Sequence, residues 1–154
     1  MDVNSINPIL KAFAEILPQI GFQDIAKKGI SLEGATLENP GVLINIGVMG
    51  PLKGAILIGM SIDNAHQFAS KMMMGMPVSE LDELAQSALA EMGNMVCANA
   101  CSLFSQTGVM GLDISPPSLL VGKGGQVRLS VPKMIVINFS ADGIAVDVYV
   151  GLFS

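Results

Sequence analysis

The chain has 154 residues, 51% of them hydrophobic, which suits one domain spanning residues 1–154 with a substantial buried core. The net charge of −5 and the scattered basic residues argue against nucleic acid as a partner, because phosphate backbones bind clustered Lys and Arg. The most apolar region, residues 41–60, is interrupted by Asn45, Pro51 and Lys53, and the N-terminus carries no secretory signal, so we expect a cytoplasmic protein with no membrane span.

Residues 4–20 are predicted to form the first helix, since apolar side chains recur at steps of three and four. Pro8 is tolerated in a first turn, with Ser5 or Asn7 as the cap, and Gly21 is a plausible stop. The repeating apolar side chains are Ile6, Ile9, Leu10, Phe13, Ile16, Leu17 and Ile20.

The next segment changes to a period of two, which is typical of strands. Strands are predicted at residues 28–37, 42–49 and 54–60, with a turn at Asn39-Pro40-Gly41. We interpret the three as an antiparallel meander.

Two helices follow the meander. Ser61 is the expected cap of a helix that reaches Met74, and Ser79-x-x-Asp82 has the pattern of a capping box that begins a second helix ending at Gly108. Cys97 and Cys101 lie within this second helix. We interpret them as small buried residues rather than as a disulfide.

The C-terminal part is again strand-like, with predicted strands at residues 118–121, 126–131, 133–140 and 144–151. Residues 42–46 and 135–139 have similar sequences, and each leads to an apolar strand that starts at glycine. This echo suggests an α-β-β-β unit used twice, although chance similarity of two Val- and Ile-rich strands accounts for it equally well. The predicted fold class is α+β, a mainly antiparallel sheet with helices stacked on one face.

A polar stripe is predicted on the long helix, formed by Ser87, Glu91 and Asn94. Their spacing of four and three places them within a sector of about 60°, opposite an apolar face. A carboxylate and a carboxamide held together in this way can grip a partner and orient one water molecule. The same spacing also suits an ordinary solvated face, but Gly93 weakens the helix there, which suggests a close approach to its backbone.

The sequence gives little support for metal binding, nucleophilic catalysis or a phosphate-binding loop. His66, the only histidine, has no neighbouring ligands at metal-binding spacing and no nucleophile signature near it. The Gly-rich stretch at residues 122–125 precedes a strand and not a helix, unlike a phosphate-binding loop. The methionines at positions 72, 73, 74 and 76 suggest either an adhesive surface or flexible core filling.

The polar stripe resembles the signature of the CheC/CheX/FliY phosphatases of bacterial chemotaxis. That signature is Asp or Ser, three residues, Glu, two residues, Asn, and twenty-two residues before a Pro. Ser87, Glu91, Asn94 and Pro117 satisfy every position and both gaps. Residues 54–61 and the opening Ile6-Asn7-Pro8, which is typical of CheX, extend the resemblance over nearly the whole chain.

The resemblance implies a CheC-like fold and dephosphorylation of a phosphorylated CheY-like response regulator. It assigns Asn94 to positioning the attacking water and Glu91 to contacting the regulator's active-site lysine, with Ser87 and Pro117 as supporting residues. Mg²⁺ is expected in the regulator's own pocket, so no cofactor or metal of this chain is implied.

Two further expectations come from the resemblance. Related chains often carry the signature twice, but here Glu15-x2-Pro18 stands where the second would fall. We therefore expect one active site per chain, in a homodimer whose sheets join.

One alternative to a phosphatase is a non-catalytic module that binds a response regulator or a flagellar switch component. Another is a structural dimer whose stripe is merely solvated.

Overall fold

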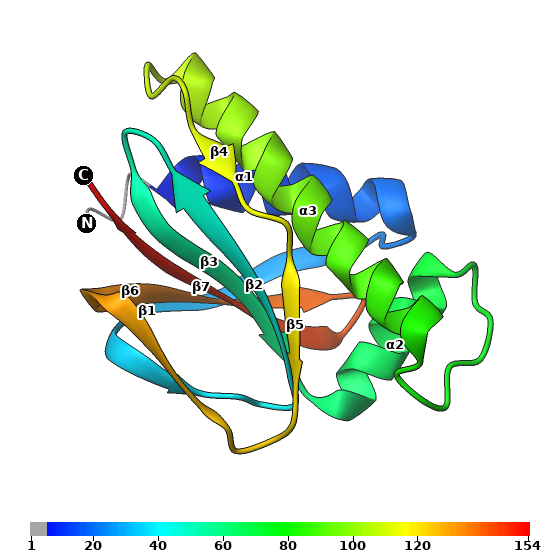
Figure 1. The fold of residues 1–154 in the computed structure, drawn as a ribbon. Coiled ribbons are helices and arrows are strands. Elements are labelled where there is room, and N and C mark those ends of the chain that lie inside the picture. Colours follow the sequence, from blue (N-terminus) through cyan, green and yellow to red (C-terminus); the bar gives the residue numbers. More distant parts are fainter. Residues whose placement is uncertain (1–5) are drawn as a thin grey trace.

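The computed structural model describes residues 6–154. Residues Asn4 and Ser5, which the sequence placed in the first helix and at its cap, lie outside the described part. The elements follow one another as shown in Figure 1: α1 (Asn7–Ile16), η2 (Leu17–Ile20), β1 (Ile25–Glu38), β2 (Val42–Met49), β3 (Lys53–Met60), α2 (Ile62–Met72), α3 (Glu83–Gln106), β4 (Asp113–Ile114), β5 (Ser118–Val121), β6 (Gln126–Ala141) and β7 (Ile144–Phe153).

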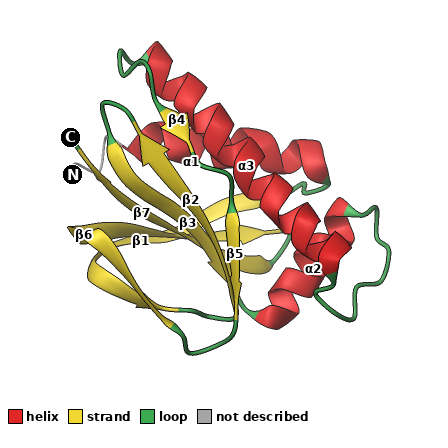
Figure 2. Cartoon of the chain, viewed as in Figure 1, coloured by secondary structure: helices red, strands yellow, loops and turns green. Residues whose placement is uncertain are grey.

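The helices form a layer on one face of an antiparallel sheet, as expected for the α+β class. Helices α1 and α3 pack together across that face, and α2 packs against the lower end of α3 (Figure 2). Alternate strand residues such as Ile44 and Ile137 point into the core between the helices and the sheet. In this core, Phe13 of α1 stacks on Phe139 of β6 with 4.4 Å between ring centroids. Among residues 6–154 no helix is long and apolar enough to cross a membrane.

The predicted meander of the first three strands is wrong. Strands β2 and β3 form the expected hairpin, but the sheet order is β1-β6-β7-β3-β2-β4, with β5 also paired to β2. Strand β1 therefore lies at one edge of the sheet, separated from β2 by three strands, and pairs with β6, with Ile25 facing Ala141 and Glu38 facing Gln126.

Asn39 explains how three residues join β1 to β2, although the two strands lie far apart in the sheet. The backbone N–H and C=O of Asn39 bond to Gly125 and Gly124, its side-chain Nδ2 donates to the carbonyl oxygen of Leu120, and its Oδ1 accepts from the N–H of Gly41. Asn39 is 4% exposed, so these bonds tie the ends of β1, β5 and β6 together beside the start of β2. The sheet curls until its two edges meet at this end.

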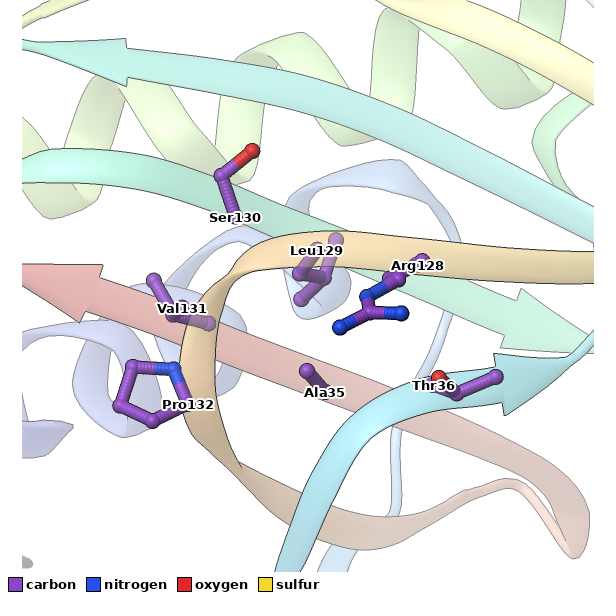
Figure 3. Close-up of a pocket in the computed structure, with 7 residues that line it drawn as sticks. All are labelled: Ala35, Thr36, Arg128, Leu129, Ser130, Val131 and Pro132. Atoms are coloured by element: carbon purple, nitrogen blue, oxygen red, sulfur yellow. The ribbon is translucent and has the colours of Figure 1, made fainter.

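Strand β6 is continuous, although the sequence suggested a break at Pro132. The register against β1 jumps from Gly34 opposite Lys133 to Thr36 opposite Arg128, so β6 carries the extra residues of a bulge. Proline lacks an N–H and is tolerated in a strand at such a place. Figure 3 shows β6 turning sharply at Pro132 around an open depression of about 730 Å³.

The sheet order agrees with an α-β-β-β unit used twice. The hairpins β2–β3 and β6–β7 meet through β3 and β7 at the centre of the sheet. Strand β1 of the first half pairs with β6 of the second, and β5 of the second half pairs with β2 of the first. Each half therefore gives its outer strand to the other.

The helix ends differ in detail from the expected ones. Ile6 is the N-cap of α1 and makes no side-chain cap bond, and that helix ends at Ile16, where the 3-10 turn η2 takes over. Ser61 caps α2 as predicted. Helix α3 begins at Glu83 rather than after Ser79, because the carboxylate of Asp82 accepts a hydrogen bond from the N–H of Ala85.

Candidate active site

The polar stripe of α3 lies on the surface. Ser87 and Glu91 are exposed and Asn94 is half-buried, whereas Leu89 on the opposite face is fully buried. The three polar side chains line an open groove of about 480 Å³, whose other wall is the segment that connects β4 to β5 and includes Pro117. The structure thus brings together all four residues of the sequence signature.

The wall opposite the stripe is fixed by hydrogen bonds to β2. Ser115 donates its backbone N–H to the carbonyl oxygen of Gly47, and its hydroxyl Oγ accepts from the N–H of Gly47 at 2.8 Å. The short strands β4 and β5 flank this anchor, and both pair with β2. Pro116 and Pro117 then restrict the backbone between them. Sequence reasoning missed Ser115, since its only signal was its position directly before two prolines.

Gly93 determines how closely α3, and with it the polar stripe, approaches the sheet. A Cβ at this position would lie 2.8 Å from Cγ2 of Ile44 and 3.2 Å from Cδ1 of Ile46, which is closer than carbon atoms pack. The close approach that the sequence suggested at Gly93 is therefore the approach of the sheet beneath α3. Because Asn94 follows directly, the contact holds the carboxamide near Pro117.

Glu91 and Asn94 are available to an incoming partner. Within the described residues, neither side chain is held by a hydrogen bond or an ion pair, and both border the open groove. A carboxylate only accepts hydrogen bonds, whereas a carboxamide both donates and accepts them. The pair can bind a cation and position a water molecule side by side. No group of three metal-ligating side chains occurs within residues 6–154.

The corresponding place on the first helix has a different arrangement. Glu15 is bonded within the chain, because its Oε2 accepts from Nδ2 of Asn99 on α3 at 3.0 Å. Pro18, which occupies the position of a second signature amide, lies in η2 and has no polar side chain. The acid on this side is therefore paired with an amide of the same chain.

The remaining reactive side chains lie away from the groove. Burial is the main cause that raises the pKa of the Cys97 thiol to about 12, and it also raises the pKa of the half-buried Cys101 thiol. Both cysteines are free, and neither is poised as a thiolate nucleophile. His66 is half-buried on α2 in a different depression, beside Val78 and Ile144.

Comparisons with known proteins show which family the sequence matches. The family model described as "Chemotaxis phosphatase CheX" matches residues 42–140. The CheY-P phosphatase CheX of Thermotoga maritima is 29% identical over 130 residues, which cover 83% of this chain and 82% of that protein.

Two solved structures confirm the expected CheC-like fold. The CheC-like superfamily protein from Shewanella sp. PV-4 superimposes with a TM-score of 0.86, 23% identity and full coverage of both chains. A chain of the CheX–CheY–BeF3–Mg²⁺ complex from Borrelia burgdorferi gives a TM-score of 0.78 at 23% identity, covering 99% of this chain and 100% of that one.

Proposed function

Because this chain belongs to the CheX family of chemotaxis phosphatases, we propose that it hydrolyses the aspartyl phosphate of a CheY-like response regulator. One observation carries the proposal. Glu91 and Asn94 stand one turn apart on the exposed face of α3, beside Pro117, and border an open groove that a partner protein can enter. The function therefore requires that both side chains reach into the regulator's phosphorylated pocket.

Asn94 is the proposed water-positioning residue. Its carboxamide holds a water molecule in line with the phosphorus, whose bond to the aspartyl oxygen breaks as the bond to the water oxygen forms. The products are inorganic phosphate and the free aspartate, and the proton lost by the water passes to solvent. An acyl phosphate is already labile, so alignment supplies most of the acceleration without a basic side chain.

Glu91 is the proposed anchor for the regulator's active-site lysine. A carboxylate and an ammonium form a charge-assisted hydrogen bond, which fixes both the distance and the register of the two proteins. Because Asn94 is one turn further along the same helix, this bond also aligns the carboxamide. Ser87 and Pro117 are proposed as supporting residues on the two walls of the groove.

The proposal assigns no cofactor to this chain, because Mg²⁺ belongs to the regulator's pocket and neutralises the phosphoryl oxygens there. It places the protein in the cytoplasm, where response regulators act. We further propose a homodimer joined at the edge of the sheet. Strand β1 lies at that edge with Ile30 and Leu32 exposed, and an unpaired strand edge with apolar neighbours is a ready site for a second chain.

The test is the rate at which a phosphorylated CheY-like regulator loses phosphate in the presence of each variant. Asn94→Ala should lower the catalysed rate by about 100-fold, the effect of losing a well-placed reactant. Glu91→Ala should weaken binding of the regulator as well as the rate. Asn99→Ala is the matched control, since it removes the same group from the same helix outside the groove, and it should retain activity.

Two results would contradict the proposal in different ways. Saturable binding of the regulator with an unchanged decay rate would make the chain a binding module. Equal activity of wild type and Asn94→Ala would remove the carboxamide from the mechanism, whichever partner is bound.

A further inference from the structure

A second groove adjoins the candidate active site. It has a volume of about 820 Å³, and Glu91 lines both grooves. We call it the methionine groove, because three methionines contribute to it from two helices and the segment after α2. Its lining residues are Gln19, Ile20, Gly21, Lys71, Met72, Met74, Gly75, Glu91 and Met95.

Met74 has an unusual backbone at the rim of this groove. It follows the C-cap of α2 with φ of +61°, in the left-handed region that glycine or asparagine normally occupies. The N–H of Met74 bonds to the carbonyl oxygen of Lys71, and that of Gly75 bonds to Ser70, the two bonds of a Schellman motif. Methionine thus occupies a left-handed position of this motif, where a side chain costs conformational energy.

Within residues 6–154, the side chain of Met74 packs against too little to offset this cost. It is 96% exposed, the largest exposure among the large hydrophobic residues described. Glycine would remove both the strain and the exposed apolar surface. Residues held in a strained backbone conformation cluster at sites that contact another molecule, and Met74 is such a residue on the rim of a groove.

The charges around the groove favour an apolar contact there. The ammonium of Lys71 is bound by the carboxylate of Asp142, which also accepts hydrogen bonds from the N–H groups of Gln23 and Asp24. That ammonium is therefore already paired, with a carboxylate that does not line the groove. Glu91 is the other charged residue of the lining, at the boundary with the candidate active site.

We infer that the methionine groove is the second half of the docking surface and takes an apolar side chain that borders the regulator's phosphorylated pocket. This inference rests on the proposed function. A regulator whose lysine reaches Glu91 covers the boundary between the two grooves, so its surface also lies over the methionines. Unbranched, flexible methionine side chains adapt to such a partner surface.

Met74→Gly tests the inference without endangering the fold, since glycine is the favoured residue at this backbone conformation. Affinity is measured for a CheY-like regulator activated with beryllofluoride and Mg²⁺, and kcat and KM with the phosphorylated regulator. Met74→Gly should weaken binding about tenfold, which corresponds to about 1.4 kcal/mol, and raise KM with kcat unchanged.

Met110→Gly is the matched control, because Met110 is also exposed (67%) but follows the far end of α3 and lines neither groove. It should bind as wild type does. In the wild-type protein labelled with ¹³C at the methionine methyl groups, the signal of Met74 should shift when the activated regulator is added, and that of Met110 should not.

The outcomes separate the inference from the proposed function. Unchanged binding by Met74→Gly, together with the expected loss of catalysis in Asn94→Ala, would overturn the inference alone. A change in self-association of Met74→Gly with unchanged regulator binding would also overturn it and assign the groove to a second copy of the chain. A wild-type protein that neither binds nor dephosphorylates the regulator would overturn both.

Discussion

Replacing Gly93 with alanine should push α3 away from the sheet at the point where the helix carries Asn94. The new methyl group would lie 2.8 Å from Cγ2 of Ile44, whereas carbon atoms pack best at about 3.5–4.0 Å. Ile44 and Ile46 are both fully buried, so neither has free space into which it can rotate. The helix must therefore rise by roughly 1 Å, or the core must distort by a similar amount.

Two opposing effects determine the change in stability of Gly93→Ala. Overpacking a core costs about 1–3 kcal/mol, and exchanging glycine for alanine within a helix gains about 1 kcal/mol. The net loss in the free energy of unfolding is therefore about 0–2 kcal/mol, or a few degrees in Tm at about 2–4 °C per kcal/mol. Activity should fall much further, because a displacement of about 1 Å in a positioning group can cost about 100-fold.

The assay compares thermal unfolding with the rate of regulator dephosphorylation, for Gly93→Ala, Ile44→Ala and the double variant. Removing the γ-methyl of Ile44 makes room for the new group, so the double variant should be more stable than the sum of the two single changes predicts. A Gly93→Ala protein with a raised Tm and the wild-type rate would refute the idea that this contact positions the site.

Three further predictions concern the supports of the fold and the site. Ser115→Ala removes the acceptor of the Gly47 N–H and should lower kcat several-fold with little change in Tm, measured with the phosphorylated regulator; an unchanged rate would count against an anchoring role. The hydrogen bond from Lys71 is the main cause that lowers the pKa of Asp142 to about 2. Folding stability from this group is therefore present above pH ~4 and is lost as the pH falls towards 2. The difference in Tm between wild type and Asp142→Asn should narrow over that window, and a constant difference would contradict the assignment. Leu32→Lys should weaken self-association in sedimentation experiments if β1 is the dimer edge, and an unaffected dimer would place the interface elsewhere.

The polar stripe was accessible from the sequence because it depends on helix periodicity alone. Glu91 and Asn94 share a face whatever the rest of the chain does, and the buried residues opposite them define which face points outward. Pro117 is different, because spacing along the chain does not place it beside a helix. Its position was predicted only through the resemblance to a family, and the pairing of β4 and β5 with β2 is the physical reason for it.

The pairing of β1 with β6 could not be predicted from the residues near β1 alone. The turn at residues 39–41 has the composition of a hairpin turn, and nothing near it reveals that the side chain of Asn39 ties together segments from distant parts of the chain. The left-handed backbone of Met74 could not be predicted either, because a methionine-rich segment at a helix end does not reveal which residue adopts that conformation. Long-range pairing and backbone strain emerge only from the assembled structure.

Each half of the chain contributes its outer strand to the other half, so the first half cannot complete its strand pairing until the second half has been synthesised. Strand β1 ends at Glu38, but its partner β6 begins only at Gln126, so the growing chain carries an unmatched strand until residues 126–141 have been synthesised. Neither half should survive as an autonomous fragment, and a stop codon before β6 should yield an aggregating product. Such pairings between remote segments also predict slow refolding from denaturant.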